Sequence, residues 1–389
     1  MGEWREVSLE DVTTRIGDGL HGTPKYNSTG EYYFINGNNL KDGKIIIKPD
    51  TKKVSVDEAL QYQKPLSDKS ILLSINGTIG NLAFYNSEKC MLGKSACYIN
   101  VSDEVDVKFL YYHCLDEEFQ FYIEMVATGT TIPNVPLKGI RQYSFNLPSL
   151  KEQKAIAEVL SSIDDKIDLL HRQNKTLEEL AQTLFRQWFI EEAKDEWEEV
   201  LITDLFEVKD GTHDSPKQKE IGKPLITTKH MSNNKLDIEN AYLISEEDFG
   251  KVNKRSIVEQ YDILFSMIGT IGLMYLEQSE KIDYAIKNIG LFKTSQNKDY
   301  MYFLYLWLKS SYGKEFIHEN RSGSTQEYIS LTSLRNIIFY IPNTQTIINF
   351  NEKVNPLFEK INANQQQIKT LENIRDTLLP RLMSGEVRV

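Results

Sequence analysis

A ladder of apolar residues that occurs twice constrains the fold of this chain more than any other feature. Between residues 156 and 188, apolar side chains recur at alternating steps of four and three, the spacing of the a and d positions of a coiled coil. The first ladder consists of Ile156, Leu160, Ile163, Ile167, Leu170, Leu177, Ala181, Leu184 and Trp188. A second ladder, at an offset of 194, consists of Phe350, Val354, Leu357, Ile361, Ile368, Leu371, Leu378 and Leu382. The sequence therefore predicts two long, related helices.

The segments in front of the two ladders also repeat, in the same order and at offsets of 191 to 194. Among the matching stretches are Trp4-Arg5-Glu6-Val7 with Trp197-Glu198-Glu199-Val200, and Gly77-Thr78-Ile79-Gly80 with Gly269-Thr270-Ile271-Gly272. Further on, Thr128-Gly129-Thr130-Thr131 matches Ser322-Gly323-Ser324-Thr325. The chain is therefore a tandem duplication of a unit of about 190 residues, which is too long for a solenoid repeat.

Each unit begins with a segment of mixed secondary structure and ends with the helix. Short apolar runs bounded by Gly, Asn and Ser predict strands at Tyr32–Ile35, Ile45–Ile47, Ile71–Ile75 and Asn81–Tyr85. Val107–Val126 predicts an aromatic-rich amphipathic helix, whose first part Met301–Phe316 copies. The predicted fold class is α+β. The predicted domains are residues 1–148 and 196–342, with helical spacers at residues 149–195 and 343–389.

Two copies of one helix can cover each other's apolar seam by packing as an antiparallel coiled coil. The alternative is that each helix only faces the core of its own unit. Asn174 falls at an a position and Asn364 at a d position, and buried asparagines specify register and orientation. We therefore predict that these two residues set the antiparallel register. Pro356 would kink the second helix or mark a late start.

Composition sets limits on location and chemistry. The formal net charge of −11 argues against a protein that coats DNA non-specifically, but it does not exclude a specific reader with local basic loops. No run of 18 apolar residues predicts a membrane span, and no secretory signal is visible. Cys90, Cys97 and Cys114 form neither a zinc pattern nor an even disulfide set, which indicates reduced thiols and the cytoplasm.

Catalytic motifs are absent or incomplete. Gly93-Lys94-Ser95 imitates the end of a P-loop without its first glycine, since position 88 is Glu88. Glu207-Val208-Lys209 has a nuclease-like spacing without a preceding carboxylate motif, and six scattered histidines give no metal-ligand pattern. We expect no catalytic residues, no metal and no cofactor in this chain.

Two globular domains alternating with two similar helices resemble the specificity subunit of type I restriction-modification systems. The Trp-x-x-Val start of each unit, the Gly-Thr-Ile-Gly turn and the stretch from Leu147 to Gln153 leading into Ile156 carry the resemblance over essentially the full chain. In the second unit Thr344-Gln345-Thr346-Ile347 replaces Leu150-Lys151-Glu152-Gln153. The resemblance implies two target-recognition domains that read a split double-stranded DNA sequence. It also implies helices that dock two methyltransferase subunits, which restriction subunits can join. S-adenosylmethionine, ATP and Mg would belong to those partners.

The duplication separates scaffold residues from candidate DNA-reading residues. Shared polar residues in Gly/Pro loops could hold phosphates, or they could simply cap solvent loops; they are His21, Lys25, His213 and Lys217. Loops whose polar residues differ between the units are candidates for base contacts, because Asn and Gln suit adenine and Lys suits guanine. These candidates are Asn36, Asn38 and Asn39 against Thr228, Lys229 and His230, and Thr130, Thr131 and Asn134 against Ser324, Thr325, Gln326 and Tyr328.

Two other functions remain open from the sequence. A duplicated protein–protein scaffold would use the helices only as a spacer, and its binding need not depend steeply on salt. A specificity subunit for a fused methylase-nuclease would be distinguished by a partner that carries a nuclease domain.

Overall fold

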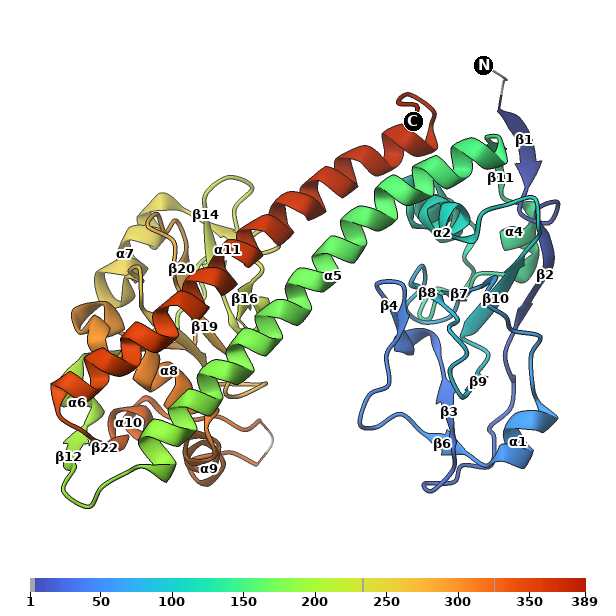
Figure 1. Cartoon of the computed structure of the whole chain (residues 1–389). Helices are drawn as coiled ribbons and strands as arrows, with labels where there is room; N and C mark the ends of the chain where they lie inside the picture. Colours follow the sequence, from blue (N-terminus) through green and yellow to red (C-terminus); the bar gives the residue numbers. More distant parts are fainter. Residues whose placement is uncertain (1–3, 233, 325) are drawn as a thin grey trace. The chain divides into compact units, whose positions relative to one another are not determined.

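The computed structural model describes residues 4–232, 234–324 and 326–389, and the chain divides into two compact units. Unit 1 consists of Met1–Leu169 and Gln367–Val389, and unit 2 consists of Leu170–Gln366 (Figure 1). Each unit therefore contains one half of each long helix. The expected domain boundaries, which separate the globular segments from the helical spacers along the chain, stay a prediction.

Unit 1 is an α+β domain with four small sheets. A four-stranded sheet has the order β2-β10-β7-β8 with antiparallel neighbours, where β2 is Thr13–Asp18, β7 Ser70–Ser74, β8 Leu82–Phe84 and β10 Ala96–Val101. A second sheet has the order β6-β3-β9, built from β3 (Tyr32–Ile35), β6 (Lys53–Val54) and β9 (Cys90–Leu92). Strands β1 (Arg5–Ser8) and β11 (Ser144–Leu147) pair antiparallel at the entrance to the long helix. Short strands β4 (Leu40–Lys41) and β5 (Lys44–Ile45) form a hairpin.

Unit 2 repeats this arrangement strand by strand. Its four-stranded sheet is β13-β21-β18-β19, with β13 Val208–Asp210, β18 Ile263–Ser266, β19 Met274–Leu276 and β21 Ile289–Phe292. The second sheet, β17-β14-β20, contains β14 (Lys223–Ile226), β17 (Leu243–Ile244) and β20 (Ala285–Ile286). Strands β12 (Glu198–Leu201) and β22 (Ile338–Ile341) pair like β1 and β11, and β15 (Met231–Ser232) and β16 (Lys235–Leu236) pair like β4 and β5. The common topology confirms the tandem duplication and the α+β class.

Short helices complete each unit. Unit 1 contains α1 (Val56–Gln61), α2 (Val107–Leu115), α3 (Glu117–Val126) and α4 (Leu137–Gln142). Unit 2 contains α6 (Ile202–Leu205), α7 (Glu246–Ser256), α8 (Met301–Lys309), α9 (Ser311–Glu319) and α10 (Leu331–Arg335). The sequence predicted one helix over 107–126, and this was wrong, because the segment forms two helices that are interrupted at Asp116. Asp116 is extended (φ −63°, ψ 147°) and its carboxylate caps α3 at the amide of Glu118. Ser310 plays the same part between α8 and α9, capping the amide of Gly313.

The two long helices are α5 (Leu150–Arg186) and α11 (Thr344–Met383). Within unit 1, Arg375 of α11 bonds Asp164 of α5 (3.0 Å), while Leu382 packs in one core with Ile156 and Leu160. Within unit 2, the ring of Phe350 packs edge-on against that of Phe189, with 4.7 Å between the ring centroids. The side-chain amide of Asn364 donates a hydrogen bond to Asn174 (2.7 Å). In each unit, the position on α5 falls as the position on α11 rises. The predicted antiparallel packing is therefore confirmed.

The apolar ladders form the buried seams, with shifts near the helix ends. On α5 the seam follows Ile156, Leu160, Ile167, Leu170 and Ala181 as predicted. It then moves to Phe185, and to Phe189 in the π-helical segment Gln187–Glu191 that continues α5, in place of Leu184 and Trp188. On α11 the seam also includes Ile347, Phe358, Leu379 and Met383, which the prediction omitted. The shift follows from the period of 3.6 residues of a straight α-helix, which drifts away from a heptad spacing of 3.5.

Asn174 and Asn364 meet in unit 2. The side-chain amide of Asn364 donates to Oδ1 of Asn174 (2.7 Å) and to Oε1 of Gln173 (2.9 Å). Asn364 is 1% exposed, and its own Oδ1 has no hydrogen-bond partner among the described residues. A buried side-chain amide whose hydrogen-bond acceptors lie on the facing helix reaches those acceptors in only one alignment of the two helices. The pairing supports the predicted role in register without testing it.

The two long helices start with different caps. At α5, the hydroxyl of Ser149 accepts from the amide of Glu152 (3.4 Å) and the Glu152 carboxylate accepts from the amide of Ser149 (3.3 Å), which is a capping box. At α11, Oδ1 of Asn343 accepts from the amide of Thr346 (3.0 Å). Because α11 already begins at Thr344, the late start suggested by Pro356 was wrong. Pro356 lies on the exposed face of the helix.

Candidate nucleic-acid interface

In unit 1, the loops that carry most of the candidate residues meet at one end of the four-stranded sheet. Strands β2 and β7 end there, at Asp18 and Ser74, and β8 and β10 begin there, at Leu82 and Ala96. The register places Ser74 opposite Ala96 and Asp18 opposite Cys97. We call this end of the sheet, with the loops attached to it, the loop edge.

Hydrogen bonds tie the loops of the unit 1 loop edge to one another. The amide of Gly37 donates to the Ser95 hydroxyl (2.9 Å), and this hydroxyl donates to Oδ1 of Asn36 (2.9 Å). The amide of Gly77 donates to the carbonyl of Pro133 (3.0 Å). The loops of residues 36–39, 75–81, 93–95 and 127–134 are thus held as one surface.

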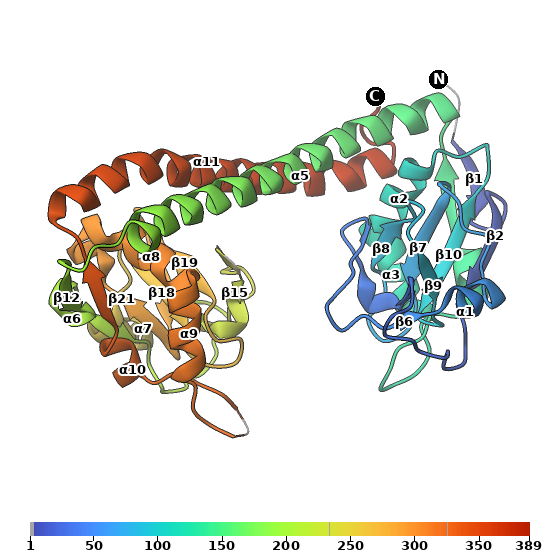
Figure 2. The same ribbon diagram turned by 60° about the horizontal axis from the view of Figure 1, so that its bottom comes forward.

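Unit 2 has the same loop edge. Strands β13 and β18 end there, and β19 and β21 begin there. Its loops are also cross-linked, since the amide of Ile329 donates to the carbonyl of Met267 (2.9 Å) and Nδ1 of His213 bonds Oδ1 of Asn288 (2.8 Å). In Figure 2 the loops that follow α3 and α9 each lie on the side of their own unit away from α5.

The shared glycine turn is part of both loop edges. Gly77, Gly80, Gly269 and Gly272 all have positive φ, between 77° and 91°. This conformation favours glycine over residues with a Cβ, which confirms the predicted turns. The intervening Thr78 and Thr270 are exposed. The turn is therefore a scaffold feature that presents one threonine to solvent in each unit.

The two shared histidines have the same partner in both units. Nε2 of His21 lies 2.6 Å from Oδ2 of Asp18, and Nε2 of His213 lies 2.9 Å from Oδ2 of Asp210. Each histidine is thus held at the end of the outer strand β2 or β13. The shared lysines are exposed, and the backbone amide of Lys25 donates to the Glu58 carboxylate on α1 (2.9 Å). Lys217 is likewise exposed.

In the first variable loop, some candidates face solvent and others hold the loop together. Asn38 and Lys229 are exposed at equivalent positions, and Thr228 is half-buried. Asn39 is buried; its amide donates to the Ile46 carbonyl (3.0 Å) and its oxygen accepts from the amide of Asn36 (3.1 Å). Nδ1 of His230 accepts from the amide of Thr227 (3.0 Å). Burial lowers the pKa of His230, so this imidazole stays neutral as an acceptor.

The second variable loop is a closed hairpin in both units. Two backbone hydrogen bonds join Thr128 to Asn134 (2.8 Å each), and two join Ser322 to Tyr328 (2.9 Å each). Thr130 and Thr131 are exposed between the first pair, and Ser324 and Gln326 between the second. The amide side chain of Asn134 accepts from Asn76 (3.2 Å), and Tyr328 is 43% exposed. Thr325 lies outside the described residues.

The structure adds two lysines that sequence reasoning did not select. Lys94 precedes β10 and is exposed at the unit 1 loop edge. Its counterpart Lys287, at an offset of 193, bonds the hydroxyl of Ser215 in the loop after β13. The signal was present, since a lysine recurs at this position of the duplication. The resemblance of Gly93-Lys94-Ser95 to the end of a phosphate-binding motif concealed the recurrence of this lysine in the second unit.

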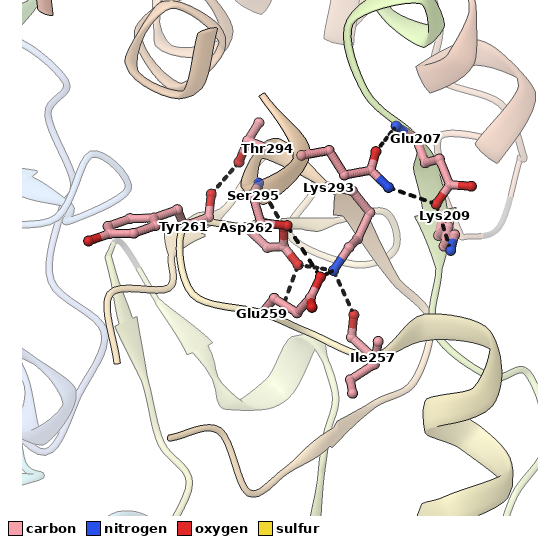
Figure 3. A network of polar contacts seen from close by, with 10 residues as sticks. Glu207, Lys209, Ile257, Glu259, Tyr261, Asp262, Lys293, Thr294 and Ser295 are labelled. Carbon is pink, nitrogen blue, oxygen red and sulfur yellow. Dashed lines mark hydrogen bonds and ion pairs between the residues drawn. The ribbon is translucent and has the colours of Figure 1, made fainter. Parts of the chain in front are cut away.

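The nuclease-like Glu207 and Lys209 neutralise each other. Their side chains form an ion pair (2.7 Å), and Gln296 donates to the same carboxylate (3.1 Å; Figure 3). The hydrogen bond from Lys209 is the main cause of the lowered pKa of Glu207. Within residues 4–232, 234–324 and 326–389, no group of three or more His, Cys, Asp or Glu side chains could hold a metal ion. None of the helices in the described ranges could cross a membrane.

Two copies of one α+β scaffold, each presenting differently decorated loops at the end of a sheet, define a class of duplicated recognition proteins. The family model "Type I restriction modification DNA specificity domain" matches residues 1–179 and 194–375. The chain therefore belongs to this family, and it is a non-catalytic DNA specificity subunit of the type I restriction-modification class.

Named relatives agree with the family. The chain is 29% identical to the type I restriction enzyme MjaIX specificity subunit of Methanocaldococcus jannaschii over 349 residues, with 82% of this chain and 78% of the relative covered. It is 23% identical to the HindI specificity subunit of Haemophilus influenzae, with both chains fully covered. The crystal structure of a type I S subunit from M. genitalium has the same fold, with a TM-score of 0.58, 21% identity and coverage of 98% of this chain and 96% of the other.

Proposed function

We propose that this chain reads a split DNA target, with the loop edge of unit 1 reading one half and the loop edge of unit 2 reading the other. The observation that carries the proposal is that one scaffold is used twice while the exposed side chains of its variable loops differ. Asn38 stands where unit 2 has Lys229, and the exposed Ile132 of the unit 1 hairpin stands where unit 2 has Gln326. Different polar edges on one backbone frame select different bases.

The candidate residues have two roles in this proposal. Exposed residues of the variable loops contact base edges, and His21, Lys25, His213, Lys217 and the two added lysines contact phosphates. Asn39 and His230 hold the backbone of their loops, because their side chains are already bonded within the loop. We therefore place them behind the reading surface.

The long helices α5 and α11 would dock two methyltransferase subunits, and restriction subunits could join them. S-adenosylmethionine, ATP and Mg would then bind to those partner subunits, and the complex would work in the cytoplasm. Support comes from the relatives, which are named as subunits of type I restriction enzymes. The different caps at Ser149 and Asn343 give the two helix starts different surfaces for such contacts.

The test is adenine-methylation mapping of DNA from cells that express this chain with the methyltransferase encoded beside it. We expect a methylated motif of two short sequences separated by an unread spacer. A chain that leaves no methylated motif, and whose binding to other proteins does not depend on salt, would instead be a protein–protein scaffold.

Single substitutions test which unit reads which half of the DNA motif. Lys229→Ala or Gln326→Ala should change recognition of one half of the motif by about 1–3 kcal/mol per lost base contact, without changing the other half. The matched control is Asn38→Ala, at the position equivalent to Lys229, which should affect the opposite half. Methylation of both halves at the wild-type rate in all three variants would remove these residues from the reading surface.

A further inference from the structure

Unit 1 has a polar pocket on its outer strand β2. The pocket has a volume of about 460 Å³ and runs along β2, from Asp18 at the loop edge back to Thr13. The side chains of Arg15, Lys64 and Arg141 line it. Two carboxylates, those of Glu10 and Asp18, also reach it, and Asp18 is paired with His21. The pocket is continuous with the loop edge through Asp18.

The three cations of the pocket have no acidic partner. In the part of the chain that the structure describes, no carboxylate forms an ion pair with Arg15, Lys64 or Arg141. Arg141 is positioned by a hydrogen bond from its guanidinium to the carbonyl of Ile16 (2.8 Å). Arg15 is exposed, and Lys64 is half-buried. Cations that form no ion pair within the chain can bind an anion from outside it.

Gly17 and Tyr98 shape the pocket together. They face each other across β2 and β10, and a Cβ at Gly17 would lie 2.6 Å from the Tyr98 hydroxyl. The absence of this Cβ lets the buried Tyr98 ring pass over β2 and bring its hydroxyl to the pocket, which Arg15 also lines. A phenol hydroxyl beside a guanidinium adds a neutral donor to the charged ones.

The equivalent place in unit 2 carries side chains of different charge and size. Glu207 stands at the position of Arg15, and Lys209 and Leu291 stand as a cross-strand pair at the positions of Gly17 and Tyr98. Ser256 stands at the position of Lys64. The Glu207–Lys209 ion pair occupies the strand surface (Figure 3). Among the three cations, only Arg141 is kept, as Arg335, which donates to the carbonyl of Val208 (3.0 Å).

We propose that the unit 1 pocket binds a backbone phosphate of duplex DNA beside the half-site that the unit 1 loop edge reads. Arg15 and Lys64 supply the charge, the Tyr98 hydroxyl supplies a further donor, and Arg141 is a positioning residue. The inference rests on the proposed function and adds an asymmetry to it: the half-site of unit 1 is anchored by a phosphate contact that unit 2 does not make. A phosphate contact carries no sequence information, so it strengthens binding without narrowing the motif.

The experiment measures binding of the full chain, with its methyltransferase partner, to a duplex that contains the mapped motif, over a series of salt concentrations. For Arg15→Gln/Lys64→Gln we expect the slope of log K against log salt to become shallower by about 1, the value for one lost phosphate contact. The methylated motif should stay the same. Lys69→Gln is the matched control, because Lys69 precedes β7 at the opposite end of the same sheet and is paired with Asp103. It should leave the slope unchanged.

A second arm uses duplexes in which single phosphates beside the unit 1 half-site are replaced by uncharged methylphosphonates. A methylphosphonate at one position should lower the affinity of the wild-type protein. At the same position it should leave the affinity of the Arg15→Gln/Lys64→Gln variant unchanged. Lys64→Gln alone covers the case that the substitution of Arg15 harms folding. An unchanged salt slope in the variants, with a split motif in the wild type, would overturn the phosphate pocket alone. Absence of the split motif in the wild type would overturn the proposed function as well.

Discussion

At the scale of single residues, the duplication replaces a neutral pair by an ionic one at the same place in the two sheets. In unit 1, the Ser70 hydroxyl donates to Oδ1 of Asn100 (2.8 Å), and the Asn100 amide donates to the Pro65 carbonyl (2.6 Å). In unit 2, Lys293 donates to Asp262 (2.5 Å) and to the carbonyl of Ile257 (3.0 Å; Figure 3). Lys293 is 3% exposed and Asp262 is fully buried.

Removing one member of the ionic pair should cost far more than exchanging both. Lys293→Asn leaves the buried Asp262 carboxylate without its charge partner, and we expect the free energy of unfolding to fall by about 3–5 kcal/mol. Adding Asp262→Ser recreates the unit 1 pair and should restore most of that loss. Denaturant unfolding of the two variants measures the difference. A double variant as unstable as the single one would show that the two residues are not coupled.

His113 gives unit 1 a dependence on pH. The imidazole is 3% exposed, stacks on Phe145 (4.2 Å between ring centroids) and bonds the Tyr143 hydroxyl (3.2 Å). Burial lowers the pKa of His113 from 6.5 to about 4. Below pH 6.5 the unfolded chain therefore binds a proton that the folded chain does not accept until about pH 4.

The stability contributed by the neutral imidazole is thus present above pH 6.5 and lost as the pH falls toward 4. We expect the free energy of unfolding to decrease in this window by about 1.4 kcal/mol per pH unit on account of His113. In His113→Phe this part of the pH dependence should disappear. Unfolding curves at several pH values give the difference, with the exposed His171→Gln as the control. An equal pH dependence in wild type and His113→Phe would contradict the assignment.

The sequence predicted which loops form the candidate site but not the role of each residue in them. Asn38 and Asn39 are adjacent and identical in type, yet one faces solvent and the other is buried. The difference arises because the turn at Gly37–Asn39 directs the second side chain toward Ile46, a contact that no local pattern records. The pocket on β2 could not be predicted from the sequence either. Arg15 and Tyr98 come together only through strand pairing, and Lys64 joins them from the segment between α1 and β7.

At the scale of elements, the long helices were predictable because their periodic patterns run over many turns. The break at Asp116 was not, since the apolar residues of α2 and α3 continue across it. Asp116 was visible as a good capping residue, but a capping residue inside an apolar pattern does not by itself end a helix. Burial of α2, with six of its residues in the core, decided the outcome.

Replacing Asn174 and Asn364 by Leu should stabilise the helix pair and loosen its alignment. The double variant removes a buried amide oxygen that lacks a partner among the described residues, so its thermal unfolding should occur at a higher temperature. Nitroxide labels at Thr183 of α5 and Glu352 of α11, both in unit 2, report the register by electron paramagnetic resonance. We expect one distance in the wild type and a broader or second distance in the variant. A single unchanged distance would remove the two asparagines as register determinants.

At the scale of the whole molecule, the shared topology of the two units predicts that their globular segments can be exchanged. We expect that replacing residues 1–148 by residues 196–342 gives a chain whose methylated motif is symmetric, with the unit 2 half-site twice. The same exchange removes Arg15 and Lys64, so the salt slope of DNA binding should also become shallower. Methylation mapping and a salt titration of the chimera test both points. A motif that keeps the original unit 1 half-site would contradict the division of labour.

The core of unit 1 contains residues from the far end of the chain. Leu379, Leu382 and Met383 of α11 pack with Ile156 and Leu160, and unit 1 includes Gln367–Val389. During translation, the whole of unit 2, Leu170–Gln366, leaves the ribosome between the two parts of unit 1. The domain that is synthesised first is therefore the one that is completed last. A ribosome that stalls late in the message releases a chain in which unit 2 has all its segments and unit 1 exposes an unfilled apolar groove, the kind of surface that chaperones and proteases recognise.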